Sequence, residues 1–196
     1  EILAARGFAR VGDWAFFVES FTGGPAPLAV TDGTAGGTRV FADLLPFVGS
    51  AEEGYEPVAL SDRLVLAATS GGSAQLWAVI PTELVPEVLT SLVDAFPIRR
   101  LAAQAIGDRA LFVATLPAPP SDSRDHLFLS DGTAIGTIDV AVGCDAAGSC
   151  GIRDLGTMGG VAYFVVSDSG GTSLWRTDGT VPGTAEIEAF DCASGC

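Results

Sequence analysis

Thr31-Asp-Gly-Thr-Ala-Gly-Gly-Thr38, Ser130-Asp-Gly-Thr-Ala-Ile-Gly-Thr137 and Thr177-Asp-Gly-Thr-Val-Pro-Gly-Thr184 are three copies of one eight-residue phrase. Each copy follows a short apolar segment that begins with leucine, and a fourth segment of this kind lacks the phrase. Successive leucines are 48, 51 and 47 residues apart (Leu28, Leu76, Leu127 and Leu174). This period is too long for leucine-rich or ankyrin repeats, and it fits a unit of four short strands, the blade of a β-propeller.

Each unit can be divided into four successive strands, A to D. Strand A is expected at 8–11, 58–60, 103–106 and 155–158. A turn with Gly or Asp leads to strand B, an apolar run rich in β-branched and aromatic residues, at 14–18, 64–68, 111–114 and 163–166. We expect strand B to be buried on both faces. Strand C carries the leucine, and the repeated phrase then turns the chain into strand D, at 38–42, 87–92, 137–142 and 184–190.

The repeat predicts an all-β protein, a β-propeller built from four four-stranded blades within a single domain, 1–196. A chain of 196 residues can bury roughly 70% of the surface that it exposes when unfolded. The blades are expected at about 6–46, 55–93, 99–143 and 152–190. Four blades can close into a ring, or they can be part of a larger ring, with this chain a fragment of a longer array or with another chain completing the ring. Both arrangements stay open, because an unclosed arc leaves two sheet edges free to pair.

The repeated phrase has the chemistry of a tight turn. An aspartate side chain accepts backbone N–H bonds two residues further on, and glycine adopts positive φ at little steric cost. Metal binding is the alternative, but one carboxylate per blade supplies too few ligands for a cation such as Ca²⁺. We therefore interpret six residues of the phrase as structural: Asp32, Gly33, Asp131, Gly132, Asp178 and Gly179.

The repeat resembles that of a bacterial protein family named for the consensus Glu-Leu-Trp-x-x-Asp-Gly-Thr. The resemblance extends over all four units, and it implies secreted or cell-surface propellers whose role is mostly unassigned. The chain departs from the consensus at Ile80-Pro-Thr82, which stands where Asp-Gly-Thr is expected. The leading Glu is also replaced in every unit, by Pro27, Gln75, His126 and Ser173. Any role attached to that Glu does not carry over to this chain.

The four cysteines lie in two short segments that each follow a strand D. Four cysteines allow three pairings, and proximity favours Cys144 with Cys150 and Cys192 with Cys196, each closing a small ring worth roughly 2 kcal/mol. Disulfides indicate an oxidising location, which for this chain is extracellular, at the cell surface or periplasmic. Zinc is the alternative, but no histidine lies near either segment and neither has the Cys-x-x-Cys spacing, so we expect no metal.

The charge of the chain bears on its partners. The formal net charge of −14 disfavours nucleic acid and anionic lipid surfaces. No apolar run approaches the roughly 20 residues of a membrane helix, and Glu1 does not begin a signal peptide, so we expect no membrane insertion. All ten basic residues are arginine, which is typical of a GC-rich bacterial genome.

Propeller geometry places the B–C and D–A connections on one face, which we call the loop face, and the tight A–B and C–D turns on the other. The loop face has the long connections, at 21–26, 44–57, 116–125 and 144–150, and loops on a rigid scaffold are where binding normally resides. It is acidic with an aromatic contact, a combination that suits a sugar or a cationic partner. The candidate binding residues are Tyr55, Glu52, Glu53, Glu56, Asp122 and Asp125. The alternative is that these acids only solvate a loop.

Catalytic motifs are absent from the sequence. The single histidine, His126, adjoins Asp125, and adjacent strand residues point to opposite faces, so the two side chains are poorly placed to act on one atom. No Gly-x-Ser-x-Gly or His-Glu-x-x-His motif occurs. Two polar hairpins, 121–125 and 167–171, are candidates for a Ca²⁺ ion, but neither has the EF-hand spacing, and we expect no cofactor.

These observations favour a noncatalytic binding or scaffolding propeller at the bacterial cell surface or in the periplasm, with protein partners. Two alternatives stay open: an accessory propeller domain or subunit of a secreted enzyme, and a carbohydrate-binding module. A sugar-stacking role for the three tryptophans would favour the second alternative. We expect instead that Trp77 and Trp175, which share a repeat position, pack between blades, and that Trp14 is partly exposed.

Overall fold

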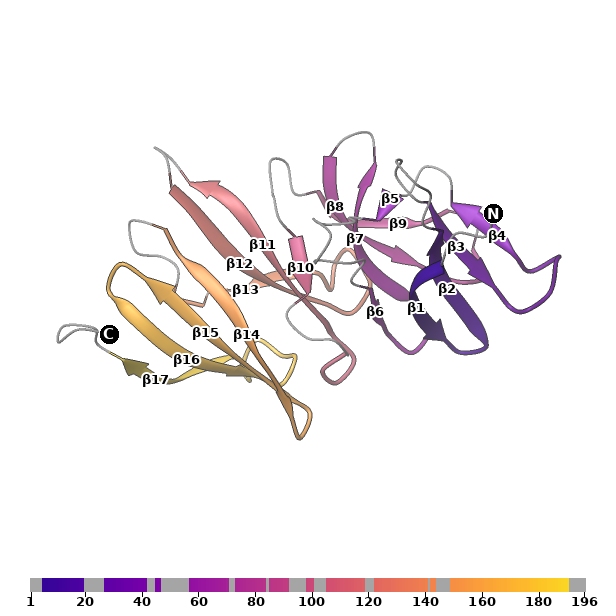
Figure 1. Ribbon diagram of the computed structural model, residues 1–196. Coiled ribbons are helices and arrows are strands. Elements are labelled where there is room, and N and C mark those ends of the chain that lie inside the picture. The colour runs from indigo at the N-terminus through magenta and orange to yellow at the C-terminus, as the bar shows by residue number, and fades with distance from the viewer. Residues whose placement is uncertain are drawn as a thin grey trace.

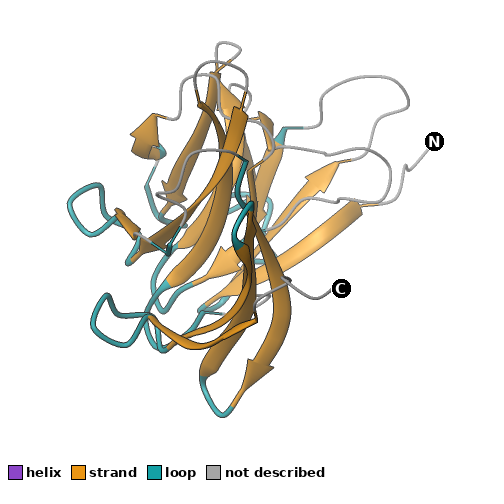
Figure 2. Cartoon of the chain, turned by 90° about the vertical axis from the view of Figure 1, so that its left-hand side faces the viewer, coloured by secondary structure: helices purple, strands orange, loops and turns teal. Residues whose placement is uncertain are grey.

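The computed structural model of the chain describes residues 5–19, 27–41, 45–46, 57–70, 73–83, 85–91, 98–100, 105–118, 122–140, 142–143 and 149–190. These residues form strands and turns, with no helix among them (Figure 2). It follows that the part of the chain described here holds no helix that could span a membrane.

The strands form four antiparallel sheets in chain order. The first sheet contains β1 (Ala5–Val11), β2 (Trp14–Glu19), β3 (Leu28–Thr31) and β4 (Arg39–Phe41). The second contains β5 (Leu45–Pro46), β6 (Val58–Ala59), β7 (Leu64–Ser70), β8 (Ser73–Val79) and β9 (Glu87–Ser91). The third contains β10 (Ile98–Arg100), β11 (Ala110–Ala118), β12 (Asp122–Ser130) and β13 (Ile138–Val140). The fourth contains β14 (Gly151–Met158), β15 (Val161–Asp168), β16 (Gly171–Thr177) and β17 (Ala185–Phe190).

Strand A differs from its expected position in the second and third sheets. In the second sheet it is split: β5 pairs with the far end of β7 and β6 with its beginning, so Leu45–Pro46 belongs to the second sheet and not to the first. In the third sheet β10 pairs with residues 112–114, which places strand A about five residues earlier than 103–106. Apolarity alone could not locate these short segments, because an edge strand of two or three residues has no periodicity to read.

The connection expected as a loop at 116–125 is instead mostly a hairpin. Strands β11 and β12 pair continuously from Ala110↔Ser130 to Ala118↔Asp122. The proline at 117 does not end β11, because proline is tolerated where its missing N–H is not needed by the ladder.

The four sheets stand side by side along an arc, from β1–β4 at one end to β14–β17 at the other (Figure 1). We call each sheet a blade, its face toward the following blade the leading face, and its face toward the preceding blade the trailing face. Three buried apolar clusters fill the three junctions between successive blades. At the junction of blades 3 and 4, for example, the leading face of blade 3 meets the trailing face of blade 4 through Leu111, Val113, Leu127, Ala162, Phe164 and Val166.

Burial of strand B depends on the place of its blade in the array. In blades 2 and 3, residues 64–67 and 110–114 are buried on both faces, as expected from their apolar sequence. In blade 4, β15 alternates between buried and half-buried residues, and β2 of blade 1 does the same over residues 15–18. The expectation of two buried faces is therefore correct for the inner blades and wrong for the end blades, because each end blade has a neighbour on one side only.

The tryptophans take the positions expected of them. Trp77 packs against the cluster between blades 1 and 2, and Trp175 packs against the cluster between blades 3 and 4. Trp14 is half-buried, and the guanidinium carbon of Arg39 lies 5.5 Å from the centre of its ring.

The described blades do not close into a ring. No buried cluster among the described residues joins blade 4 to blade 1, and these two blades lie at opposite ends of the molecule (Figure 1). Of the two arrangements that the repeat allows, this structure shows an open arc.

Candidate functional site

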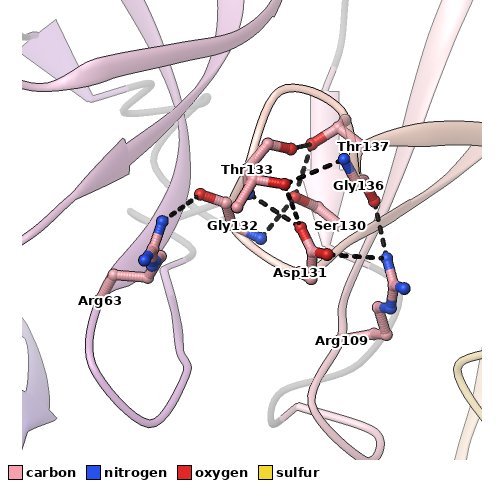
Figure 3. A network of polar contacts seen from close by, with 8 residues as sticks. All are labelled: Arg63, Arg109, Ser130, Asp131, Gly132, Thr133, Gly136 and Thr137. Carbon is pink, nitrogen blue, oxygen red and sulfur yellow. Dashed lines mark hydrogen bonds and ion pairs between the residues drawn. The ribbon is translucent and has the colours of Figure 1, made fainter.

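The repeated phrase forms one hydrogen-bonded corner three times, between strands C and D. In blade 3, Asp131 Oδ1 accepts bonds from the backbone N–H of Thr133 at 2.9 Å and from its hydroxyl at 2.7 Å (Figure 3). The equivalent pairs of bonds are made by Asp32 and Asp178. These are the bonds, two residues along the chain, by which an aspartate holds a turn.

A chain of hydroxyl groups closes the same corner. Gly132 N–H donates to Ser130 Oγ at 3.1 Å, and Ser130 Oγ lies 2.7 Å from Thr137 Oγ1. Thr137 Oγ1 donates its only proton to the carbonyl of Thr133 at 2.7 Å, so Ser130 must be the donor in the bond to Thr137. The corners of blades 1 and 4 contain the same chain. The first and last residues of the phrase are therefore explained by hydrogen bonding.

The second glycine of the phrase leaves room for the aspartate. A Cβ atom at Gly136 would collide with the carboxylate of Asp131, and Gly37 and Gly183 stand in the same relation to their aspartates. The first glycine, Gly132, has φ of +81°, a conformation that other residues rarely adopt. Every fixed position of the phrase thus serves the turn itself.

The hydrogen bonds of the corner favour the ionised aspartate. Bonds from the Thr34 hydroxyl and N–H lower the pKa of Asp32, and those from Thr180 lower the pKa of Asp178. Burial on its own would raise the pKa of Asp131, but the bonds from Thr133 and the charge of Arg109 outweigh it, and the net pKa is lowered. A carboxylate held in this way is a poor proton donor or acceptor near neutral pH.

The corner also contacts the preceding blade. Arg63, in the A–B turn of blade 2, donates to the carbonyl of Gly132 at 2.8 Å, and a Cβ atom at Gly132 would collide with the Arg63 side chain (Figure 3). At the next junction, a Cβ atom at Gly179 would collide with the carbonyl oxygen of Ile106 in blade 3. The first glycine therefore allows two blades to approach closely, which is a structural role.

The predicted loop-face residues fall largely outside the described part of the chain. Tyr55, Glu52, Glu53 and Glu56 lie among residues that the structure does not describe, and Asp122 is the first residue of β12. The structure therefore brings none of these side chains into a described site, and the binding role predicted for them stays a prediction.

Asp125 differs from the expectation that it is exposed on the loop face. Its side chain is only 7% exposed, Oδ1 accepts a bond from Thr115 Oγ1 at 2.6 Å, and Oδ2 accepts a bond from Ile152 N–H at 2.8 Å. The carboxylate therefore ties blade 3 to blade 4 and is not available to a partner. Sequence could not show this, because the residue lies inside a strand that was expected as a loop.

The described part of the loop face contains a hollow of about 160 Å³ between blades 3 and 4. It is lined on one side by Gly143 and on the other by the β15–β16 hairpin and β17 of blade 4. Its polar and aromatic lining residues are Asp168, Glu186, Thr172, Ser173 and Phe190. The hollow is therefore acidic, but none of its lining residues is among those predicted for the loop face.

The β15–β16 hairpin, which forms part of the wall of the hollow, is held by hydrogen bonds to Asp168. Asp168 Oδ1 accepts bonds from Gly170 N–H at 2.7 Å and Gly171 N–H at 3.1 Å, so the 167–171 hairpin uses this oxygen for its own geometry. Within the described residues, no group of three or more His, Cys, Asp or Glu is placed to hold a metal ion. The sequence does not single out Glu186 or Phe190 as binding residues. The alternation of acidic and apolar residues over 185–190 is the signal that points to an exposed strand.

His126 pairs with an acid other than its chain neighbour. Its Nδ1 lies 2.7 Å from Asp139 Oδ2, across the β12–β13 pair, while Asp125 lies on the other face of β12. The expectation that His126 and Asp125 are separated by strand alternation is confirmed. The His126–Asp139 pair is half-exposed and is compatible with sheet pairing.

Cys150 is disulfide-bonded, and the other three cysteines lie outside the described residues. Its backbone is tied to blade 3, because Asp125 N–H donates to the Cys150 carbonyl at 3.0 Å and Cys150 N–H donates to the Ser123 carbonyl at 3.2 Å. The disulfide thus lies at the junction of blades 3 and 4, near the loop end of β12.

Comparison with known proteins supports the fold. No protein-family model and no curated protein matches the chain. Among solved structures, TolB from Acinetobacter baumannii is similar with a TM-score of 0.53 at 10% identity, over 96% of this chain and 43% of TolB. The β-propeller domain of the Trilobed protease from Pyrococcus furiosus aligns with a TM-score of 0.35 at 9% identity, over 95% of this chain and 83% of that chain.

The chain is a β-propeller of four four-stranded blades, in which strand A of the second blade is split. It spans less than half the length of the TolB chain with which it aligns. At this identity the likeness establishes the fold and not the activity.

Proposed function

We propose that the chain is a noncatalytic protein-binding propeller that recognises a cationic side chain of a protein partner on its loop face. The observation that carries the proposal is the hollow between blades 3 and 4, whose lining residues include Asp168 and Glu186. Carboxylates attract a lysine or arginine and accept charge-assisted hydrogen bonds from it. The net charge of −14 would steer a basic partner toward the protein.

The size of the hollow suits one long side chain. The hollow has a volume of about 160 Å³. A pocket that encloses a drug-sized ligand is larger, at about 300 Å³ or more. A partner that inserts a single arginine or lysine therefore fits better than an extended glycan, and this favours the protein-binding role over the carbohydrate-binding alternative.

We further propose an extracellular, cell-surface or periplasmic location. The support is the disulfide of Cys150, since structural disulfides persist in oxidising compartments. The resemblance of the repeat to secreted bacterial propellers agrees with it. Cys144 is the partner that we propose for Cys150, and peptide mapping without reduction tests the pairing: a Cys150 peptide linked to any other cysteine would contradict it.

The proposal that the chain is not an enzyme rests on how its acids are used. The corner aspartates hold the turns, Asp125 ties two blades together, and His126 pairs with Asp139 on the surface of a sheet. An accessory role beside a catalytic domain on the same or another chain stays open as the second candidate function.

Site-specific photocrosslinking tests the binding site. A photoreactive amino acid replaces Thr172, in the wall of the hollow, or Thr180, an exposed residue of the blade 4 corner on the opposite face. Each protein is irradiated with the secreted and cell-envelope proteins of a bacterium that encodes the chain. We expect a discrete polypeptide adduct from position 172 and none from position 180. Equal labelling from both positions, or none from either, would contradict the proposal.

Charge variants test the chemistry. Glu186→Gln removes a carboxylate from the hollow, and Glu188→Gln is the matched control, an exposed acid two residues away that does not line it. We expect Glu186→Gln to reduce the yield of the adduct at position 172 several-fold and Glu188→Gln to leave it unchanged. Equal effects of Glu186→Gln and Glu188→Gln on the yield would contradict the proposed site, because they would show that only the net charge of the protein matters.

A further inference from the structure

The three corners contain the only Asp-Gly steps of the chain, at 32–33, 131–132 and 178–179. In such a step the backbone nitrogen of the glycine can attack Cγ of the aspartate, because glycine has no Cβ atom to crowd the approach. The N–Cγ bond forms, a Cγ–O bond breaks, and the proton of the nitrogen leaves with the hydroxyl of the protonated carboxyl group as water. Hydrolysis of the resulting succinimide gives either aspartate or isoaspartate, in which the backbone runs through the former side chain. Each Asp-Gly step is therefore a site where the backbone can rearrange.

The fold requires glycine at this position of the corner. Gly132 and Gly179 have φ of +81° and +86°, a conformation that residues with a side chain rarely adopt. A Cβ atom at either position would also collide with the preceding blade. The corner cannot replace its glycine with a bulkier residue, so it keeps the reactive step.

In the closed corner, both reacting groups are engaged in other bonds. The N–H of Gly132 donates to Ser130 Oγ at 3.1 Å, and Asp131 Oδ1 accepts bonds from the N–H and hydroxyl of Thr133 (Figure 3). A Cβ atom at Gly136 would collide with both carboxylate oxygens, so the carboxyl group lies against the backbone of Gly136. Turning Cγ toward the nitrogen of Gly132 requires these bonds to break.

The corners of blades 1 and 4 hold the same groups in the same way. Gly33 N–H donates to Thr31 Oγ1 at 3.0 Å, and Gly179 N–H donates to Thr177 Oγ1 at 3.1 Å. The aspartates of these two corners are exposed to solvent, so a protection that all three steps share comes from the bonds and not from burial. The lowered pKa of each aspartate acts in the same direction, because an ionised carboxylate has no hydroxyl group to leave as water.

We propose that the three Asp-Gly steps are sites of isoaspartate formation that react only when their corner opens. In isoaspartate the free carboxylate is attached to Cα and the backbone is longer by one methylene group, so the geometry of the turn is lost. The hydrogen bonds of the closed corner thus protect a step that the corner itself requires, and local opening sets the rate of the modification. This inference concerns the corners and does not rest on the proposed function.

Mass spectrometry with electron-transfer fragmentation tests the proposal, because it distinguishes isoaspartate from aspartate at each step. The wild-type chain is kept in warm, mildly acidic buffer, one sample folded and one unfolded in urea, and a Thr-Asp-Gly-Thr peptide with and without urea corrects for the effect of the denaturant. We expect isoaspartate to accumulate about tenfold or more slowly in the folded chain at all three steps, because the open corner is a minor state. The exposed Asp178 should be protected as well as the half-buried Asp131. Equal rates in the folded and unfolded samples at any of the three steps would overturn the proposal.

Two variants each loosen one corner and leave the other two as controls in the same molecule. Thr133→Val removes a hydroxyl that binds Asp131, and Ser130→Ala frees the N–H of Gly132. We expect each change to raise the rate of isoaspartate formation at Asp131 several-fold and to leave the other two steps unchanged. Thr82→Val, an exposed threonine in the turn of blade 2 that lacks the phrase, should change none of the three rates. An unchanged rate at Asp131 in both variants would overturn the proposal. An equal rise at all three steps would also overturn it, because protection would then come from the fold as a whole and not from the corner.

Discussion

Asp125 in blade 3 accepts a hydrogen bond from the backbone N–H of Ile152 in blade 4, at 2.8 Å, while its other oxygen accepts one from Thr115. Asp125 is buried, so water cannot readily replace its carboxylate as the acceptor of these two bonds if the residue is substituted. This residue shows how an acid that resembles a surface ligand in the sequence can instead join two blades.

Replacement of this acid should weaken the junction of blades 3 and 4. We expect Asp125→Ala to lower the free energy of unfolding by about 2 to 4 kcal/mol, because the buried N–H of Ile152 and the half-buried hydroxyl of Thr115 lose this acceptor. Asp13→Ala is the control, since the Asp13 side chain is 99% exposed and should change stability by less than about 0.5 kcal/mol. Urea denaturation measures both, and equal effects of the two changes would contradict the assignment.

The two adjacent glycines of the first corner should respond differently to alanine. A Cβ atom at Gly37 would collide with Asp32, whereas one at Gly36 has no atom of the described residues within 4 Å. We expect Gly37→Ala to lower the unfolding temperature by a few degrees, because Asp32 must give up its bonds to Thr34. Gly36→Ala should be neutral or slightly stabilising. Thermal unfolding of the two variants side by side checks this, and a cost at Gly36 as large as that at Gly37 would show that the corner geometry is wrong.

Stability should fall on acidification through the three corner aspartates. Their pKa values are lowered from 3.8 in the folded chain, so below about pH 4 the unfolded state binds protons that the folded state does not. The stabilisation is therefore complete above pH 5 and is lost as the pH falls through the lowered folded pKa values. The triple variant with Asp32→Asn, Asp131→Asn and Asp178→Asn should be less stable at pH 6 and should lose less on going to pH 3. Urea midpoints at the two pH values give the comparison; parallel losses in the two proteins would rule out this linkage.

Arg63 and Arg39 should differ in how much they contribute to the free energy of unfolding. Arg63 donates to the Gly132 carbonyl across a junction. By contrast, Nε and Nη2 of Arg39 are buried and have no hydrogen-bond partner among the described residues. We expect Arg63→Met to cost about 1 to 2 kcal/mol. Arg39→Met should change stability by less than about 0.5 kcal/mol, since the cation–π contact with Trp14 that is lost is offset by relief of unpaired buried donors. Chemical denaturation ranks the two, and a reversed order would refute the reasoning.

The architecture could be predicted from the sequence because it is repeated. The phrase that ends in Thr38, Thr137 and Thr184 fixed the length of the unit and the position of strands C and D, and the apolar runs located strand B. Strand A of blades 2 and 3 could not be located, because its pairing depends on which residues of β7 and β11 remain free. The candidate binding site could not be predicted from the sequence. The hollow at Glu186 and Phe190 forms because β17 lies beside residue 143 of the preceding blade. Nothing in the local sequence of β17 reports that it lies beside residue 143 of the preceding blade.

The role of the repeated aspartate as a turn residue is the central claim, and a double-mutant cycle between Asp131 and Thr133 tests it most directly. Asp131→Ala, Thr133→Val and the double variant are compared by urea denaturation, with and without EDTA. The two hydrogen bonds between these residues predict a coupling energy of about 1 to 2 kcal/mol that EDTA does not change. A coupling of zero, or one that disappears when EDTA is added, would show that the carboxylate serves a bound cation or something else outside the turn.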